Sequence, residues 1–164
     1  MKNFFSQYNF QIITTNCLAE GFLYSIKNLS SEFVFQMEHD WIFIEENIRH
    51  SLQDILVCMK QENIEYLRFN KRQNVIAGSD AILKEIITDN NFDYTITNNG
   101  SNNPHIINRQ LYIKEKYYTF IKITKGSGGI EENLNNKLKK GVLYGKLNYP
   151  PTIIHLDGRK NFEK

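Results

Sequence analysis

Residues 117–141, YYTFIKITKGSGGIEENLNNKLKKG, join an alternating apolar run to a glycine-rich turn and a lysine-rich amphipathic segment. The period-two alternation of residues 117–124 predicts a strand. Beyond the glycines, apolar residues at four-residue steps predict a helix, formed around Ile130, Leu134, Leu138 and Val142. The largely apolar run at 152–157 predicts a following strand, so this helix is expected to cross over between two parallel strands of one sheet.

The rest of the chain carries similar short periodic patterns. Alternating or apolar runs predict strands over residues 10–15, 21–27, 32–37, 41–45, 64–70 and 92–97. Helical spacing of apolar residues predicts a helix over 45–61, and Ser79 as an N-cap predicts a second helix of about ten residues. Residues 109–124 read as a hairpin with its turn near Glu115.

These elements predict an α+β protein. Antiparallel strands and a helix occupy about residues 1–75, and an αβββαβ mixed-sheet core occupies about residues 79–158. The length of 164 residues fits a single domain, and the chain contains no internal repeat that would divide it.

Charge is distributed unevenly along the chain, although the net charge is only +2. Residues 105–164 hold twelve basic and five acidic residues, a net +7, and the preceding residues hold eight basic and thirteen acidic residues, a net −5. A basic C-terminal portion is the pattern expected if one face meets a polyanion such as DNA or RNA. The alternative is that surface lysines cluster in a lysine-rich sequence without such a partner.

Cysteine content and hydropathy indicate the compartment. The two cysteines, Cys17 and Cys58, form no CxxC pair and no zinc-type spacing with histidine. No apolar stretch has the length of a signal-peptide core or of a membrane span. We therefore expect a reduced protein in the cytoplasm that does not cross a membrane.

The glycine turn is a candidate phosphate site. It ends a predicted strand and precedes a predicted helix, where free backbone N–H groups and the helix dipole favour an anion. Glycines permit the backbone to fold around such an anion. The candidate nucleic-acid-binding residues are Lys122, Gly126, Ser127, Gly128, Gly129, Lys137 and Lys140. A flexible connector and a solvated helix face are the alternatives for this segment.

The αβββαβ succession resembles the core of the PD-(D/E)xK nucleases, a class that includes many restriction endonucleases. The resemblance covers roughly residues 79–158. In that family a Pro-Asp begins the second core strand, and an acidic-x-Lys motif lies on the third. Here the corresponding residues are Pro104-His105 and Ile123-Thr124-Lys125, so the lysine matches while histidine and isoleucine replace the two acids.

The resemblance implies a metal-dependent phosphodiesterase acting on DNA or RNA, with Mg²⁺ as the cofactor. In it Lys125 would stabilise charge on the scissile phosphate, and Glu85 would correspond to an acid that some members carry on the preceding helix. His105 would act as a general base or bind a softer metal, and Asp93 would supply a metal-binding carboxylate. A homodimer that completes the metal site between subunits is a further possibility. Glu85 and His105 each have an alternative reading as solvated surface residues.

A second hypothesis belongs to a different class of protein. The missing carboxylates and the −5 charge of residues 1–104 suit a small inhibitor or immunity-type module that binds a basic protein without catalysis.

Overall fold

The computed structural model describes residues 12–16, 18–76, 80, 82–86, 92–116 and 138–156. The helices and strands within these ranges are, in chain order, α1 (Leu18–Asn28), β1 (Phe33–Gln36), β2 (Trp41–Phe43), the 3-10 turn η1 (Glu45–Asn47), α2 (Leu52–Gln61), β3 (Tyr66–Arg68), β4 (Ile82–Ile86), β5 (Tyr94–Thr97), β6 (His105–Asn108), α3 (Arg109–Lys116), β7 (Gly141–Tyr144) and β8 (Ile153–His155). Within the described ranges, no helix has the length and apolar character needed to cross a membrane.

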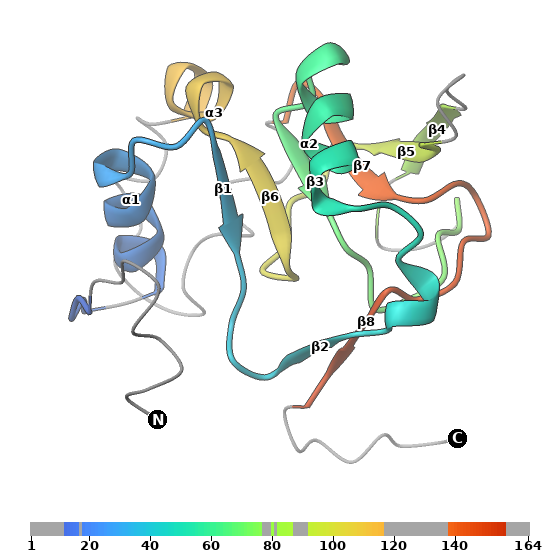
Figure 1. Cartoon of the computed structure of the whole chain (residues 1–164), viewed down its shortest axis with the longest axis horizontal. Coiled ribbons are helices and arrows are strands. Elements are labelled where there is room, and N and C mark those ends of the chain that lie inside the picture. Colours follow the sequence, from blue (N-terminus) through green and yellow to red (C-terminus); the bar gives the residue numbers. More distant parts are fainter. Residues whose placement is uncertain are drawn as a thin grey trace.

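The strands of the described residues form one six-stranded sheet and one two-stranded sheet. The larger sheet has the order β1-β6-β3-β7-β5-β4, and its members come from both the first and the second half of the chain (Figure 1). Strands β3 and β7 run parallel, whereas the other neighbouring pairs run antiparallel. The sheet is therefore mixed, and the predicted α+β class is confirmed.

Two helices pack against opposite faces of the larger sheet. Adjacent residues of β3 point to opposite faces, so Tyr66 packs in one apolar cluster and Leu67 in the other. Helix α1 contributes Phe22 and Ile26 to the cluster that contains Tyr66. Helix α2, which lies in front of β3 and β7 in Figure 1, contributes to the cluster that contains Leu67. The core consequently has two layers separated by the sheet.

Helix α2 confirms the second part of the helix predicted over 45–61, whereas residues 45–47 form the separate 3-10 turn η1 and residues 48–51 are not helical. Ser51 and Asp54 form a capping box at its start: the Ser51 hydroxyl accepts from the Asp54 N–H, and the Asp54 carboxylate accepts from the Ser51 N–H. Ile55 and Met59, four residues apart, lie on one buried face. The local sequence is thus sufficient to begin this helix and to orient it.

The two-stranded sheet, which we call the ribbon, pairs β2 with β8 in antiparallel fashion, with Ile42 opposite Ile154. Figure 1 shows it at the bottom of the view, beside the larger sheet. The prediction of a strand within 152–157 is confirmed; among the described residues it pairs with β2 and not with the larger sheet. Its expected parallel partner, the strand at 117–124, lies outside the described residues. Trp41 and Ile153 turn inward and belong to the apolar core.

Five further predictions of element type are wrong. Residues 12–15, the described part of the strand expected at 10–15, form neither helix nor strand. Residues 21–27 lie in helix α1 instead of a strand, and 82–86 form strand β4 instead of the helix expected after Ser79. Residues 109–116 form helix α3 instead of a hairpin arm, and 141–144 form strand β7 where helical turns were expected. The αβββαβ order is therefore not the order of the described elements. Residues 117–137, which include the glycine turn, lie outside the described residues.

Local helical signals or strand pairing explain three of these differences. In α1 the buried residues Ala19, Phe22 and Ile26 have helical spacing, although the same segment also fits an alternating pattern. Strand β4 is held by pairing with β5, which overrides its helical pattern. Helix α3 begins after Asn108, whose side-chain oxygen accepts from the Leu111 N–H at 3.3 Å, as in an N-cap.

Candidate functional site

Most of the predicted phosphate-contacting residues lie outside the part of the chain that the structure describes. Those outside the described residues are Lys122, Lys125, Gly126, Ser127, Gly128, Gly129 and Lys137. Lys140 is described, and its Nζ donates to the Glu62 carboxylate at 3.2 Å and to the Glu62 main-chain carbonyl. The same ammonium lies 5.8 Å from the centre of the Tyr94 ring. These contacts tie the charge of Lys140 to the end of α2.

His105 lies in the core and not in a solvated loop, so that alternative is wrong. It is fully buried in β6, between the rings of Phe22 and Tyr66 at centroid distances of 5.6 Å and 4.8 Å. Burial lowers the pKa of His105 from 6.5 to about 4, with an opposing contribution from its hydrogen bond to Asn103 and a further lowering by Arg68. The imidazole is therefore neutral near pH 7. Its Nδ1 carries the proton and donates to the Asn103 carbonyl at 2.7 Å.

Glu85 and Asp93 lie at the opposite end of the sheet from His105. Glu85 is on strand β4 and not on a helix, and its carboxylate accepts from the Leu147 N–H at 3.0 Å. The Asp93 carbonyl accepts from the Gly145 N–H at 3.1 Å. Both acids thus contact the turn after β7. Four strand spacings, about 19 Å, separate β4 from β6, so Glu85 and His105 do not meet.

The residues predicted for metal binding do not form a group in the described part of the chain. No set of three or more His, Cys, Asp or Glu side chains is placed there to hold a metal ion.

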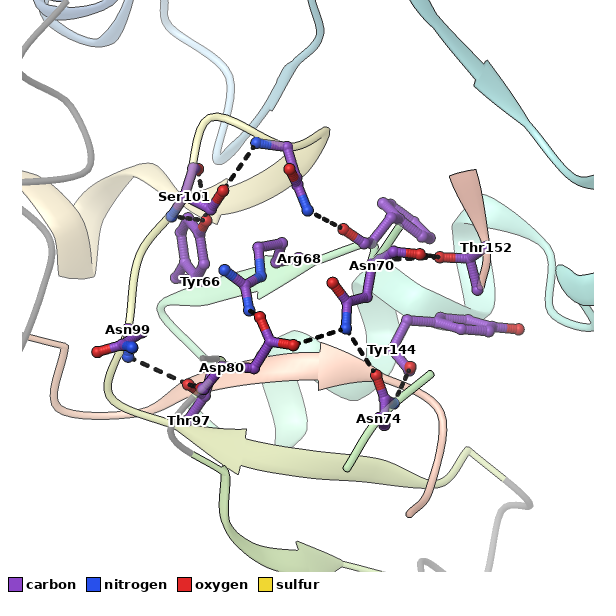
Figure 2. Close-up of polar contacts among 12 residues, drawn as sticks. Tyr66, Arg68, Asn70, Asn74, Asp80, Thr97, Asn99, Ser101, Tyr144 and Thr152 are labelled. Atoms are coloured by element: carbon purple, nitrogen blue, oxygen red, sulfur yellow. Dashed lines mark hydrogen bonds and ion pairs between the residues drawn. The ribbon is translucent and has the colours of Figure 1, made fainter. Parts of the chain in front are cut away.

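A buried polar network begins at the carboxyl end of β3 and continues into the residues that follow it (Figure 2). None of its residues belongs to the site predicted from the sequence. Arg68 Nη2 donates to Asp80 Oδ1 at 2.6 Å, and both residues are almost inaccessible to solvent. The second oxygen of Asp80 accepts from Asn70 Nδ2 at 3.1 Å, and Asn70 also donates to Asn74 Oδ1 at 3.2 Å. The Asn74 amide then donates to the carbonyl of Tyr144 at 3.0 Å.

This network connects segments that are distant in the sequence. The hydroxyl of Thr97 donates to the Asp80 carbonyl, and Thr152 Oγ1 accepts from the Asn70 N–H at 2.9 Å. The network therefore joins the end of β3 to β5, to the turn after β7 and to the start of β8. Its depth indicates a structural role, because a charge is stable in the protein interior only beside a charged or hydrogen-bonding partner. The sequence signal is a polar run, NKRQN at 70–74, directly after a buried strand.

The outward side of the ribbon exposes apolar residues. Ile42 and Ile154 are cross-strand neighbours, and they are 47% and 49% exposed. Leu156 lies two residues beyond Ile154 on the same side and is 55% exposed. We call Ile42, Ile154 and Leu156 the outer ribbon face. All three apolar side chains are therefore open to a partner on the same side of the ribbon.

The inward side of the ribbon is held in a defined geometry. The His155 ring stacks on Trp41 at a centroid distance of 4.1 Å, and its Nε2 lies 2.9 Å from Asp40 Oδ2. Lys71 Nζ lies 5.6 Å from the centre of the Trp41 ring. The Ile44 N–H donates to the Thr152 carbonyl at 3.0 Å and extends the pairing beyond β2. These contacts keep the outer ribbon face pointing away from the core.

Acidic residues precede and follow strand β2. Residues 38–46, EHDWIFIEE, contain four acids and no lysine or arginine. We call these acids the acidic rim; its members are Glu38, Asp40, Glu45 and Glu46. Glu45 and Glu46 are exposed in turn η1, whereas Glu38 and Asp40 are partly exposed.

Comparison with known proteins assigns no family to the chain: no protein-family model and no curated protein matches it.

Proposed function

We propose that this protein is a small binding module that holds another protein on the outer ribbon face and acts without catalysis. The exposed in-register pair Ile42 and Ile154 carries this proposal. Single exposed apolar residues are common on protein surfaces, but a contiguous apolar patch framed by polar residues is typical of an interaction site.

The energetics support a docking role of moderate strength. Complete burial of an Ile or Leu side chain contributes about 1.5–3 kcal/mol. Because each of the three residues is about half exposed, docking would gain about 1 kcal/mol from each of them. The remaining affinity has to come from other contacts around the face.

The rigidity of the ribbon also supports binding. Stacking of His155 on Trp41 and the Asp40 contact hold the two strands before a partner arrives. A preorganised surface loses less conformational entropy on association than a mobile one. The burial of His105 supports a packing role for that residue, since an inaccessible neutral imidazole does not reach a substrate.

A capture experiment with matched variants tests the proposal. Wild-type protein and the variants Ile154→Lys and Val57→Lys would be immobilised and exposed to an extract of the source organism, and a specifically retained protein would be purified. Val57 is a suitable control because it is 42% exposed on α2, away from the ribbon. The purified protein should bind wild type and Val57→Lys equally and Ile154→Lys at least about tenfold more weakly.

Two results would overturn the proposal. One is a purified partner that binds Ile154→Lys as tightly as wild type. The other is retention of nucleic acid alone, with heparin and oligonucleotide binding that weakens steeply with salt, as expected for phosphate contacts.

A further inference from the structure

We infer that the partner of the outer ribbon face is a basic protein segment, with lysine or arginine side chains flanking an apolar centre. This inference rests on the proposed docking function and adds the chemistry of the partner. It follows from the acidic rim, whose members precede and follow the strand that carries Ile42.

The rim places negative charge at each end of β2. Glu45 and Glu46 follow the strand in turn η1, and Glu38 and Asp40 precede it. Asp40 and Glu45 lie two and three residues from Ile42, or about 7 and 10 Å along an extended chain, which is comparable with the Debye length of about 8 Å at physiological ionic strength. A partner that buries Ile42 therefore brings its own flanking residues next to these acids.

The two exposed members of the rim are available to a partner. Glu45 and Glu46 are exposed, and the first turn of η1 contains no basic residue. Asp40 differs, because its carboxylate already contacts His155 at 2.9 Å. Glu45 and Glu46 are thus the rim residues whose charge should act mainly on the partner.

Charge at the edge of an interface chiefly steers association and selects partners. An apolar centre with an acidic rim favours a segment of complementary pattern and disfavours an acidic one, because like charges placed together cost free energy. The ribbon face should therefore distinguish basic from acidic segments that have the same apolar residues.

Three synthetic nine-residue peptides provide the test. All three share valine at alternate positions, and the remaining positions are lysine in one peptide, glutamate in the second and serine in the third. Binding would be followed by methyl NMR shifts of Ile42 and Ile154 and by calorimetry at low and high salt. We expect the lysine peptide to bind most tightly and to lose most of its advantage over the serine peptide at about 0.5 M salt.

Two double variants with the same net charge isolate the rim. Glu45→Gln with Glu46→Gln removes two rim charges, and Gln53→Lys with Gln61→Lys changes the net charge equally at exposed positions of α2. The first variant should weaken binding of the lysine peptide about three- to tenfold at low salt, and the second should weaken it much less.

The outcomes separate this inference from the docking proposal. Equal binding of the lysine and glutamate peptides, or equal effects of the two double variants, would overturn the inference. If in that case Ile154→Lys still abolished binding of all three peptides, the docking proposal would hold and only the inference about the charge of the partner would fail. Lysine-peptide binding that needs the rim but is unchanged by Ile154→Ser would instead overturn the docking proposal.

Discussion

Arg68 and Asp80 form a buried ion pair, with Nη2 2.6 Å from Oδ1, that connects strand β3 to the segment entering β4. Their side chains are 4% and 12% exposed. Asp80 is held at the same time by Asn70 and Thr97, so one residue is tied to two strands of the sheet. The pair therefore fixes the position of the residue that lies just before the edge strand β4.

Removal of one partner of this pair should be costly. Arg68→Met leaves the Asp80 carboxylate buried without its cation, and the free energy of unfolding should fall by about 3–5 kcal/mol. Urea denaturation measures the change. Lys60→Met is the control, because Lys60 and Glu32 are 66% and 44% exposed at their side chains and such a pair contributes at most about 1 kcal/mol. Equal losses in the two variants would show that the Arg68 pair does not stabilise the fold.

Stability should depend on pH through His105. Its pKa is lowered from 6.5 to about 4 in the folded protein, mainly by burial, so the unfolded chain binds the additional proton between these values. The contribution of neutral His105 to the free energy of unfolding is fully present above about pH 6.5. It is lost as the pH falls towards 4, with a slope of at most about 1.4 kcal/mol per pH unit.

Urea denaturation from pH 7 to pH 4.5 checks this contribution. His105→Phe should show a flatter dependence than wild type, whatever its absolute stability. Val57→Phe, which changes no titratable group at a position 42% exposed on α2, should keep the wild-type slope. An unchanged slope in His105→Phe would mean that the imidazole of His105 titrates normally in the folded protein.

The Cys58 thiol should be protected in the folded protein. It is a buried free cysteine, and burial together with the nearby Glu62 raises its pKa to about 11, partly offset by Lys140. Because the thiolate is the reactive form, alkylation should be slow until the protein unfolds. Iodoacetamide labelling of the Cys17→Ser variant, with and without urea, isolates this thiol. Rapid labelling in native buffer would contradict the burial of Cys58.

The docking proposal also predicts the result of a nuclease assay. Incubation with DNA or RNA and either Mg²⁺ or Mn²⁺ should give no cleavage above that of a blank preparation. Lys125→Ala is the informative variant, because the resemblance to the PD-(D/E)xK core assigns that lysine to the scissile phosphate. Metal-dependent cleavage that is lost in Lys125→Ala would establish catalysis and remove the non-catalytic part of the proposal.

Several helices and strands were predictable from the sequence because the spacing of their apolar residues agrees with the local capping and turn residues. Helix α2 has both helical apolar spacing and the capping box of Ser51 and Asp54. Strands β1, β2, β3, β5 and β8 all lie within segments predicted to be strands. The uneven charge and the acids around β2 are likewise properties of the sequence itself.

Short segments with ambiguous periodicity needed the tertiary structure. Residues 82–86 have apolar residues at helical spacing, and pairing with β5 nevertheless makes them a strand. The role predicted for His105 depended on its surroundings, and only the packing of Phe22 and Tyr66 shows that it is buried. The contact between Arg68 and Asp80 likewise depends on the tertiary structure, which brings the residue before β4 next to the end of β3.

The sequence by itself determined the α+β class, the central helix, most strand positions and the charges around β2. Only the tertiary structure decided the strand order, the burial of His105, the Arg68–Asp80 pair and the outward position of Ile42 and Ile154. The physical reason is that periodicity and capping act over a few residues. Strand pairing instead joins distant segments, as when Tyr66 lies beside Gly141, and it decides which side chains meet and which remain exposed.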